Sequence, residues 1–206
     1  MTWKSLTYFG DSMLLIPTAV IIALLLPWKS DNQRAVWYWL VAFGLAGFLV
    51  SLSKILFLGF GIGSARFNFT GFSGHSAMSA TLWPVMFWLL SGRWPGFWRT
   101  AAIGVGYFIP LLVGYSRLAI HAHSKSEVAS GLLLGFTLST LFLISQRRTA
   151  LKGFSWPQVG AALLLPLLLI GHGRIATTQQ FLARFSADLA GLERPFTRAD
   201  LFRLQQ

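Results

Sequence analysis

The chain of 206 residues is 54% hydrophobic and 11% charged, with a mean hydropathy of +0.60, a balance that excludes an ordinary soluble domain. A formal charge of +11 on so hydrophobic a chain points to an anionic membrane surface or an anionic lipid substrate, and we expect no nucleic-acid partner. The absence of cysteine excludes disulfides, thiolate catalysis and cysteine-ligated zinc.

Apolar stretches close to the roughly 20 residues that cross a bilayer as a helix recur along the chain. They predict six spans, at about residues 12–28, 35–60, 76–92, 100–116, 128–146 and 153–171. These stretches are Leu-rich and do not alternate with a period of two, which favours helices over barrel strands. We therefore expect an all-α, polytopic membrane protein with a single membrane domain over residues 1–206, built as a bundle of six transmembrane helices.

Residues 172–206 form a short amphipathic C-terminal tail. Apolar residues recur at helical spacing from Phe181 to Leu189, and Thr197-x-x-Asp200 is a helix-start pattern. This pattern is typical of interfacial helices. We expect the tail to pack against the end of the bundle without a functional role, and a direct role with substrate is the alternative.

Six crossings place the loops after the second and fourth spans on the same side as both ends of the chain. The three opposite loops carry seven basic residues, namely Lys29, Arg34, Arg93, Arg99, Arg147, Arg148 and Lys152. The positive-inside rule makes that face cytoplasmic. We therefore predict a multi-pass protein of the bacterial inner membrane whose other face looks toward the periplasm or the exterior.

Cations cluster after the second and fourth spans. Lys54, Arg66 and Arg117 would suit a phosphoryl group, and an arginine can hold two of its oxygens at once. Ser73 and Gly74 stand where the third span begins, so the free N–H groups and the positive dipole end of that helix would face the same anion. These five residues are the candidate phosphate-binding group.

Two histidines and two carboxylates lie beside these cations. His123 and Glu127 are four residues apart, hence neighbours on one helical face, and the carboxylate can hold the imidazole in the tautomer that leaves its other nitrogen free. This pair predicts a nucleophile and the group that orients it. His75 would protonate the departing oxygen and later take a proton from water. Asp11 could pair with a site arginine, although we expect it to be a solvated helix cap.

At these positions the sequence resembles the type 2 phosphatidic acid phosphatase family, whose motifs are K-x6-R-P, P-S-G-H and S-R-x5-H-x3-D. Phe72-Ser73-Gly74-His75 matches the second motif with Phe in place of Pro. Ser116-Arg117, five residues, His123, three residues and Glu127 match the third motif with Glu in place of Asp. The resemblance covers residues 54–127 and extends to the six-helix layout.

The first motif departs from this pattern. Counting from Lys54, the arginine position of the family is Gly61, and the nearest arginine is Arg66, which is followed by Phe67 rather than Pro. Either Lys54 or Arg66 is therefore open to question as an equivalent of the motif residue.

The resemblance implies a lipid phosphate phosphatase that acts through a phosphohistidine on His123, without a metal or another cofactor. It implies a substrate such as phosphatidic acid, phosphatidylglycerol phosphate, isoprenyl diphosphate or lipid A phosphate. Two alternatives stay open: a phosphotransferase of the same fold that passes the group to another lipid, and a transporter or scaffold that binds an anion without turnover. The sequence does not indicate the oligomeric state.

Overall fold

The structure, a computed structural model, describes residues 3–155, 157–160, 164 and 178–204. The main elements in chain order are α1 (Trp3–Thr7), the 3-10 helix η1 (Tyr8–Gly10), α2 (Ser12–Lys29), α3 (Ala35–Phe60), α4 (Gly74–Leu90), α5 (Gly96–Ala119), α6 (Lys125–Ser145), α8 (Thr178–Leu189) and α9 (Arg198–Leu204). Within these ranges the only β pairing is two isolated bridges. The all-α prediction is therefore confirmed for the described residues.

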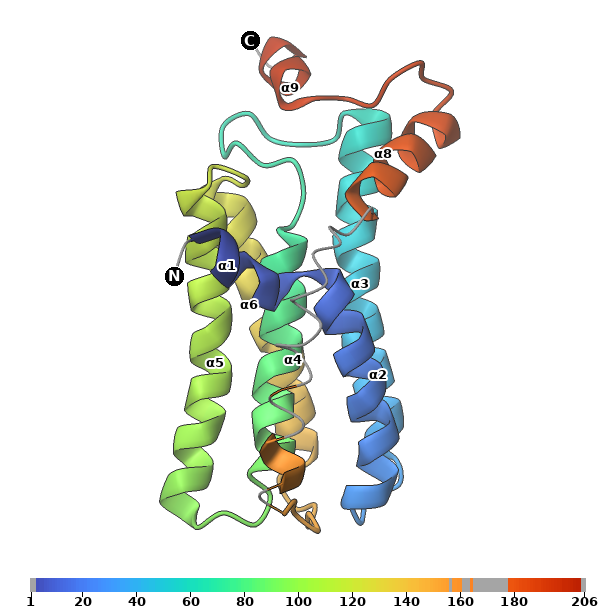
Figure 1. Ribbon diagram of the computed structural model, residues 1–206. Helices are drawn as coiled ribbons and strands as arrows, with labels where there is room; N and C mark the ends of the chain where they lie inside the picture. The colour runs from blue at the N-terminus through green and yellow to red at the C-terminus, as the bar shows by residue number, and fades with distance from the viewer. Residues whose placement is uncertain (1–2, 156, 161–163, 165–177, 205–206) are drawn as a thin grey trace.

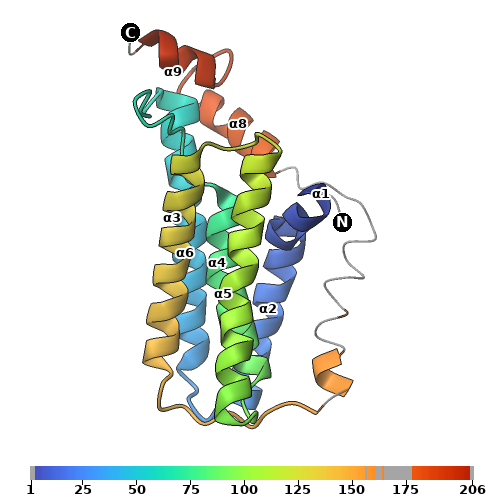
Figure 2. The same cartoon turned by 90° about the vertical axis from the view of Figure 1, so that its left-hand side faces the viewer.

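Helix α4 lies at the centre of the bundle. It packs against α5 and α6, and also contacts α2 and α3 (Figures 1 and 2). Thirteen of its 17 residues are buried, so α4 has no separate side that faces lipid. Its N-terminal half contains small residues such as Ala77 and Ala80, which let neighbouring backbones approach closely. The centre of the bundle is thus a rigid support for the residues at the start of α4.

Among the described residues, four helices, α2, α3, α5 and α6, are long and apolar enough to cross a membrane. Their outer faces carry exposed apolar side chains such as Leu24 (71%) and Leu133 (70%), as expected for contact with lipid. The chain is therefore a multi-pass membrane protein, and the second predicted span, 35–60, matches α3.

The prediction of six spans is supported only in part. The third span, predicted at residues 76–92, corresponds to α4, whose 17 residues are fewer than those of the four candidate spans. The sixth span, predicted at residues 153–171, falls largely outside the described residues. A six-span bundle therefore stays a prediction.

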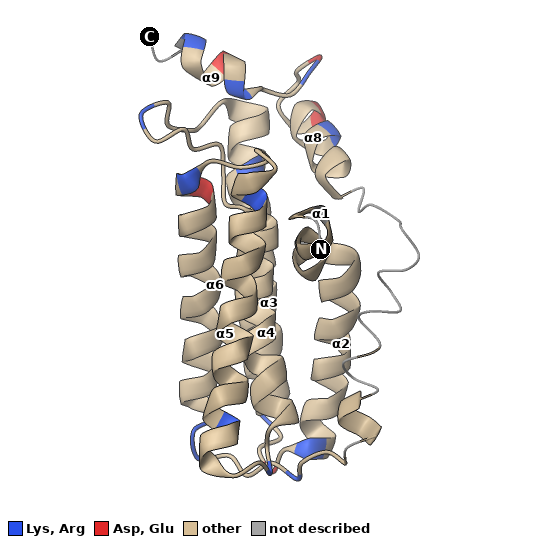
Figure 3. Ribbon diagram, turned by 60° about the vertical axis from the view of Figure 1, so that its left-hand side comes forward, with Lys and Arg blue, Asp and Glu red and all other residues tan. Residues whose placement is uncertain are grey.

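Charged residues gather at the two ends of the described helices, while the middle of the bundle is apolar (Figure 3). This distribution is the one that a bilayer imposes, because a charge in hydrocarbon is costly. The two predicted loops that carry the candidate site residues lie at the same end of the bundle as α8 and α9 (Figure 1).

The tail adopts the helices that its sequence predicts. Helix α8 packs against α3, and the N–H of Phe196 donates to the carbonyl of Leu58 at 2.8 Å. At the start of α9, the N–H of Thr197 donates to Asp200 Oδ2 at 2.9 Å, and the N–H of Asp200 donates to Thr197 Oγ1 at 3.4 Å. These two bonds form the predicted capping arrangement. The tail is therefore docked on the end of α3, and its α9 helix begins at a defined place.

Candidate active site

His123 and Glu127 form a hydrogen-bonded pair at the start of α6. His123 Nδ1 lies 2.8 Å from Glu127 Oε2, and the two side chains are 16% and 0% exposed. Because an ionised carboxylate only accepts hydrogen bonds, Nδ1 carries the proton and Nε2 keeps a free lone pair. The predicted contact is present, but not on one helical face, since His123 precedes the helix and Ser124 is its N-cap.

The local fold explains why Glu rather than Asp stands at position 127. Glu127 is the third residue of α6, and its carboxylate accepts a hydrogen bond from the N–H of the N-cap Ser124 at 3.0 Å. In return, the hydroxyl of Ser124 accepts from the N–H of Glu127 at 3.3 Å, which completes a capping box. The same carboxylate therefore caps the start of the helix and orients His123, and the longer side chain can reach both groups.

Two further elements donate to the buried carboxylate of Glu127. In the loop before α4, the N–H of Thr70 donates to Oε1 at 2.9 Å, and the hydroxyl of Thr70 donates to the same oxygen. From the C-terminal tail, Arg198 Nη2 lies 2.8 Å from Oε1 and 2.9 Å from Oε2. Sequence reasoning missed both residues. The full burial of the Glu127 carboxylate, which requires a cationic partner, is visible only in the folded chain, so the sequence carried no signal for Arg198.

The start of α4 faces the same region. Ser73 is the N-cap and makes no side-chain cap hydrogen bond, which leaves N–H groups of the first turn open to an anion. The N–H of Ser73 donates to the carbonyl of Glu127 at 3.1 Å, so the starts of α4 and α6 are tied together. Gly74 and His75 follow directly, both partly exposed.

Asp11 lies beside His75. Its Oδ2 is 3.8 Å from His75 Nε2, while its Oδ1 accepts a hydrogen bond from the N–H of Met13 at 2.8 Å and caps α2. The predicted cap is confirmed, but the expectation that it is solvated is wrong, since Asp11 is only 9% exposed. Gly10 explains this close approach: a Cβ at that position would lie 2.9 Å from the Cβ of His75. The N-terminal segment therefore packs directly on the second histidine.

Arg117 belongs to the last turn of α5, which extends past the predicted end of the span to Ala119. Its Nε is buried and has no hydrogen-bond partner among the described residues. Lys54, near the end of α3, donates from Nζ to Oε1 of Gln179 in α8. The buried Nε of Arg117 is costly without an acceptor, and an anionic ligand would supply one.

Arg66 differs from the other predicted phosphate-binding residues. It is exposed in the loop between α3 and α4, where its guanidinium lies over the ring of Phe67 at 5.5 Å. Gly61, the position at which the family motif has arginine, ends α3 with a φ of +68°, a conformation that disfavours a residue with a Cβ. The helix end therefore accounts for the missing arginine, and Arg66 is not drawn into the cluster.

Electrostatic interactions connect the remaining candidates into one cluster, which consists of His75, His123, Lys54 and Arg117. Burial lowers the pKa of His75, and the positive charges of Arg117 and Lys54 lower it further. Burial also lowers the pKa of His123, against the opposing effect of its hydrogen bond to Glu127. Both imidazoles are therefore neutral near pH 7 in the unliganded site, beside two cations. This arrangement offers a nucleophilic nitrogen next to positive charges suited to a phosphoryl group.

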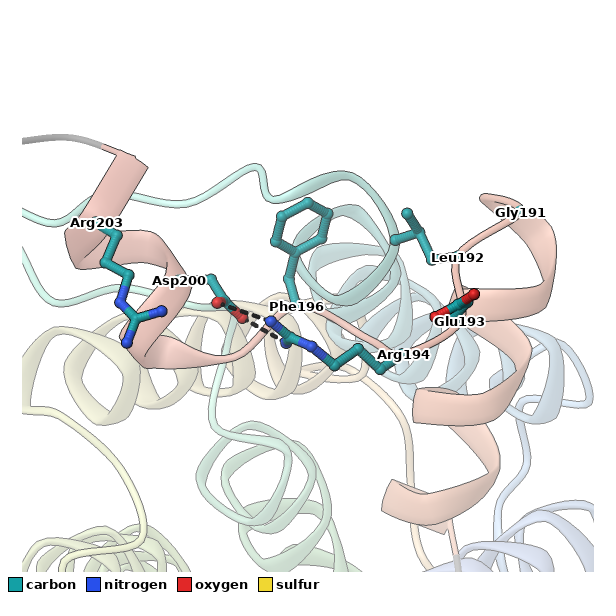
Figure 4. Close-up of a pocket in the computed structure, with 7 residues that line it drawn as sticks. All are labelled: Gly191, Leu192, Glu193, Arg194, Phe196, Asp200 and Arg203. Atoms are coloured by element: carbon teal, nitrogen blue, oxygen red, sulfur yellow. Dashed lines mark hydrogen bonds and ion pairs between the residues drawn. The ribbon is translucent and has the colours of Figure 1, made fainter.

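A separate cavity of about 540 Å³ lies within the tail. Its lining residues are Gly191, Leu192, Glu193, Arg194, Phe196, Asp200 and Arg203. Arg194 reaches across it to Asp200, with Nη1 at 2.8 Å from Oδ2 (Figure 4). This pair lowers the pKa of Asp200. None of the predicted site residues lines this cavity, and both members of the Arg194–Asp200 pair belong to the tail.

Comparisons with known proteins identify the family and the fold. Residues 57–150 match the model of the PAP2 superfamily. The chain is 43% identical over 206 residues to an uncharacterized 22.5 kDa protein in the cps region of Klebsiella pneumoniae, covering 98% of this chain and 99% of that protein. The fold is similar to the crystal structure of a transmembrane PAP2-type phosphatidylglycerolphosphate phosphatase from Bacillus subtilis, with a TM-score of 0.56 and 24% identity over 71% of this chain and 75% of that one.

Proposed function

The chain belongs to the PAP2 superfamily, and from this we propose that it is a membrane phosphatase that hydrolyses a lipid phosphomonoester or diphosphate through a phosphohistidine on His123. One observation carries the proposal. The Nδ1 of His123 is held by the buried Glu127, and its free Nε2 lies in a cluster that also contains Arg117, whose Nε is buried without a hydrogen-bond partner among the described residues. An oriented imidazole beside a partly buried cation is suited to attack on phosphorus.

In the first step, Nε2 of His123 attacks phosphorus and the bond from phosphorus to the lipid oxygen breaks. Arg117, Lys54 and the N–H groups at the start of α4 hold the phosphoryl oxygens. The negative charge of the bound substrate offsets the two cations that lower the pKa of His75, so His75 can take up a proton from solvent. It then donates this proton to the departing lipid oxygen.

In the second step, water attacks the phosphohistidine. His75, now neutral, takes a proton from that water as the new bond to phosphorus forms and the phosphorus–nitrogen bond breaks. Inorganic phosphate leaves, and His123 returns to the neutral form, with the proton on Nδ1 hydrogen-bonded to Glu127 and the lone pair on Nε2 free again. The protein groups supply the charge stabilisation, and we propose no metal or other cofactor.

The substrate class follows from where the site lies. The candidate residues lie at one end of a bundle whose outer faces are apolar, so a headgroup can reach them while its chains stay in lipid (Figure 3). We propose phosphatidic acid, phosphatidylglycerol phosphate, isoprenyl diphosphate or lipid A phosphate as substrates. The similarity to a phosphatidylglycerolphosphate phosphatase makes that lipid the first to test. We further propose an inner-membrane location with this end facing the periplasm or the exterior.

The test is phosphate release by the purified protein in detergent, from each of these four lipids, with and without a chelator. We expect His123→Ala to lower kcat by at least about 1,000-fold, the order of loss seen when a covalent nucleophile is removed. The wild-type protein should form an acid-labile, alkali-stable phosphoenzyme that the variant lacks.

The matched control is His121→Asn, since His121 is exposed in the same loop and has a φ of +57°, which Asn tolerates. This variant should keep wild-type turnover. Phosphate release by His123→Ala at the wild-type rate would refute the role of His123 as nucleophile. Absence of phosphate release by the wild-type protein from all four lipids would favour a binding protein without turnover. Loss of lipid phosphate without free phosphate would identify a phosphotransferase instead.

A further inference from the structure

The C-terminal tail places an arginine on the carboxylate that orients the proposed nucleophile. Arg198, the first residue of α9, contacts both oxygens of Glu127 through Nη2, at 2.8 and 2.9 Å. Its Nη1 donates to the side chain of Asn68 and to the carbonyl of Asn68 at 3.1 Å. The guanidinium therefore joins the loop before α4, the start of α6 and the tail at one point.

This contact differs from an ordinary surface ion pair. The tail contains a surface pair for comparison, Arg194 with Asp200, in which the arginine side chain is 65% exposed. Arg198 instead reaches a carboxylate that is 0% exposed and that also binds His123. Pairs of the first kind contribute little, whereas removing one partner of a buried pair leaves an uncompensated charge. Arg198 therefore acts on the same atom that sets the tautomer of His123.

The tail reaches the cluster at a second place. Gln179 of α8 accepts a hydrogen bond from Nζ of Lys54, one of the candidate phosphate-binding residues. The backbone bond from Phe196 to Leu58 lies between these two contacts in the tail and fixes it to the end of α3. The tail is thus held where it touches both a cation of the site and the orienting carboxylate.

We propose that Arg198 is a positioning residue that holds Glu127 against His123, so that the C-terminal tail forms part of the active site. This inference rests on the proposed function. It replaces the expectation that the tail packs on the bundle without a role.

The charge of Arg198 has a defined effect on His123. The charged or titratable groups that face His123 are Glu127, Lys54, Arg117 and His75, and Arg198 acts through Glu127. Glu127 favours the imidazolium form of His123, and the guanidinium offsets part of that negative charge. Without Arg198 the pKa of His123 should rise, so a larger fraction of the nucleophile is protonated at a given pH.

The experiment compares Arg198→Gln, Arg198→Lys and the control Arg203→Gln, an exposed arginine of the same helix. For Arg198→Gln we expect kcat to fall by about 10- to 100-fold with little change in KM, the range typical of groups that orient a catalytic ligand. The acid limb of kcat/KM should move to higher pH by roughly one unit. Arg198→Lys should recover part of the activity, and Arg203→Gln should match the wild type.

Two further measurements separate positioning from folding. Added guanidinium ion at millimolar concentration should partly restore Arg198→Ala. In the Glu127→Gln background, Arg198→Gln should cost much less than it does alone, because the group that it positions is already neutral. An unshifted pH profile in Arg198→Gln, with no guanidinium rescue, would overturn the inference.

A readout without turnover keeps the inference distinct from the proposed function. The titration of His123 can be followed by NMR in protein with labelled histidine, without any substrate. A higher pKa of His123 in Arg198→Gln than in the wild type supports the contact even if no lipid is hydrolysed, in which case the proposed function alone fails. An unchanged pKa in an active enzyme overturns the role of Arg198 alone.

Discussion

The two ends of the helix bundle both contain buried polar side chains, and they differ in how these are paired. At the end opposite the candidate site, Lys29 is 7% exposed, and its Nζ donates to the carbonyl of Gly153 at 3.0 Å and to Gln158 Oε1 at 3.3 Å. Gln146 is 0% exposed, and its Oε1 accepts from Asn32 at 3.0 Å and Thr149 at 2.9 Å. These hydrogen bonds hold together the loops that connect the helices at this end.

At the candidate site the pairing is incomplete. Glu127 is fully engaged, but the Nε of Arg117 is buried without a partner among the described residues, and His75 lies 3.8 Å from Asp11, too far for a hydrogen bond. Buried polar groups are normally paired, so an unpaired set at one end indicates room for a ligand. The same chemistry is therefore structural at one end and prepared for an anion at the other.

Among the variants that test this difference between the two ends, Arg117→Lys should cause the largest loss of activity. A lysine keeps the charge but loses the planar fork that can hold two phosphoryl oxygens, so we expect kcat/KM to fall by about 100-fold. Steady-state phosphate release measures this loss. Arg148→Lys, at the opposite end, is the matched control and should have wild-type kinetics, since that exposed arginine is among those predicted to face the cytoplasm. Normal kinetics in Arg117→Lys would remove the phosphate clamp from the mechanism.

A smaller effect is expected from Asp11→Asn. The amide can still cap α2 through its oxygen, so the fold should persist, but the negative charge near Nε2 of His75 is lost. Since that charge favours the imidazolium, the alkaline limb of kcat should move to lower pH, and kcat at pH 8 should fall by about 3- to 10-fold. The pH profile of kcat checks this, and an unmoved alkaline limb would show that Asp11 serves only as a cap.

The sequence predicted those features that depend on interactions between residues close together in the chain. Hydropathy located α2 to α6, because lipid selects apolar runs of fixed length. The spacing of four predicted the contact of His123 with Glu127, although His123 precedes the helix. Long-range contacts left no such pattern. Arg198 lies 71 residues from Glu127, and its role depends on how the tail docks. Arg66 was chosen for being the nearest arginine in the chain, whereas the turn of its loop directs it to solvent.

The smallest effect on catalysis, and a clear one on stability, should come from Gln146→Leu at the opposite end. Leucine fills similar space but leaves Asn32 Nδ2 and the hydroxyl of Thr149 without their acceptor. A buried donor left unpaired costs about 1–3 kcal/mol, and since these two donors are partly buried we expect the lower end of this range. The unfolding temperature in detergent should fall while kcat per folded protein stays unchanged. A loss of kcat in the correctly folded variant would contradict the separation of the two ends, because it would mean that hydrogen bonds at the far end of α6 affect the position of His123.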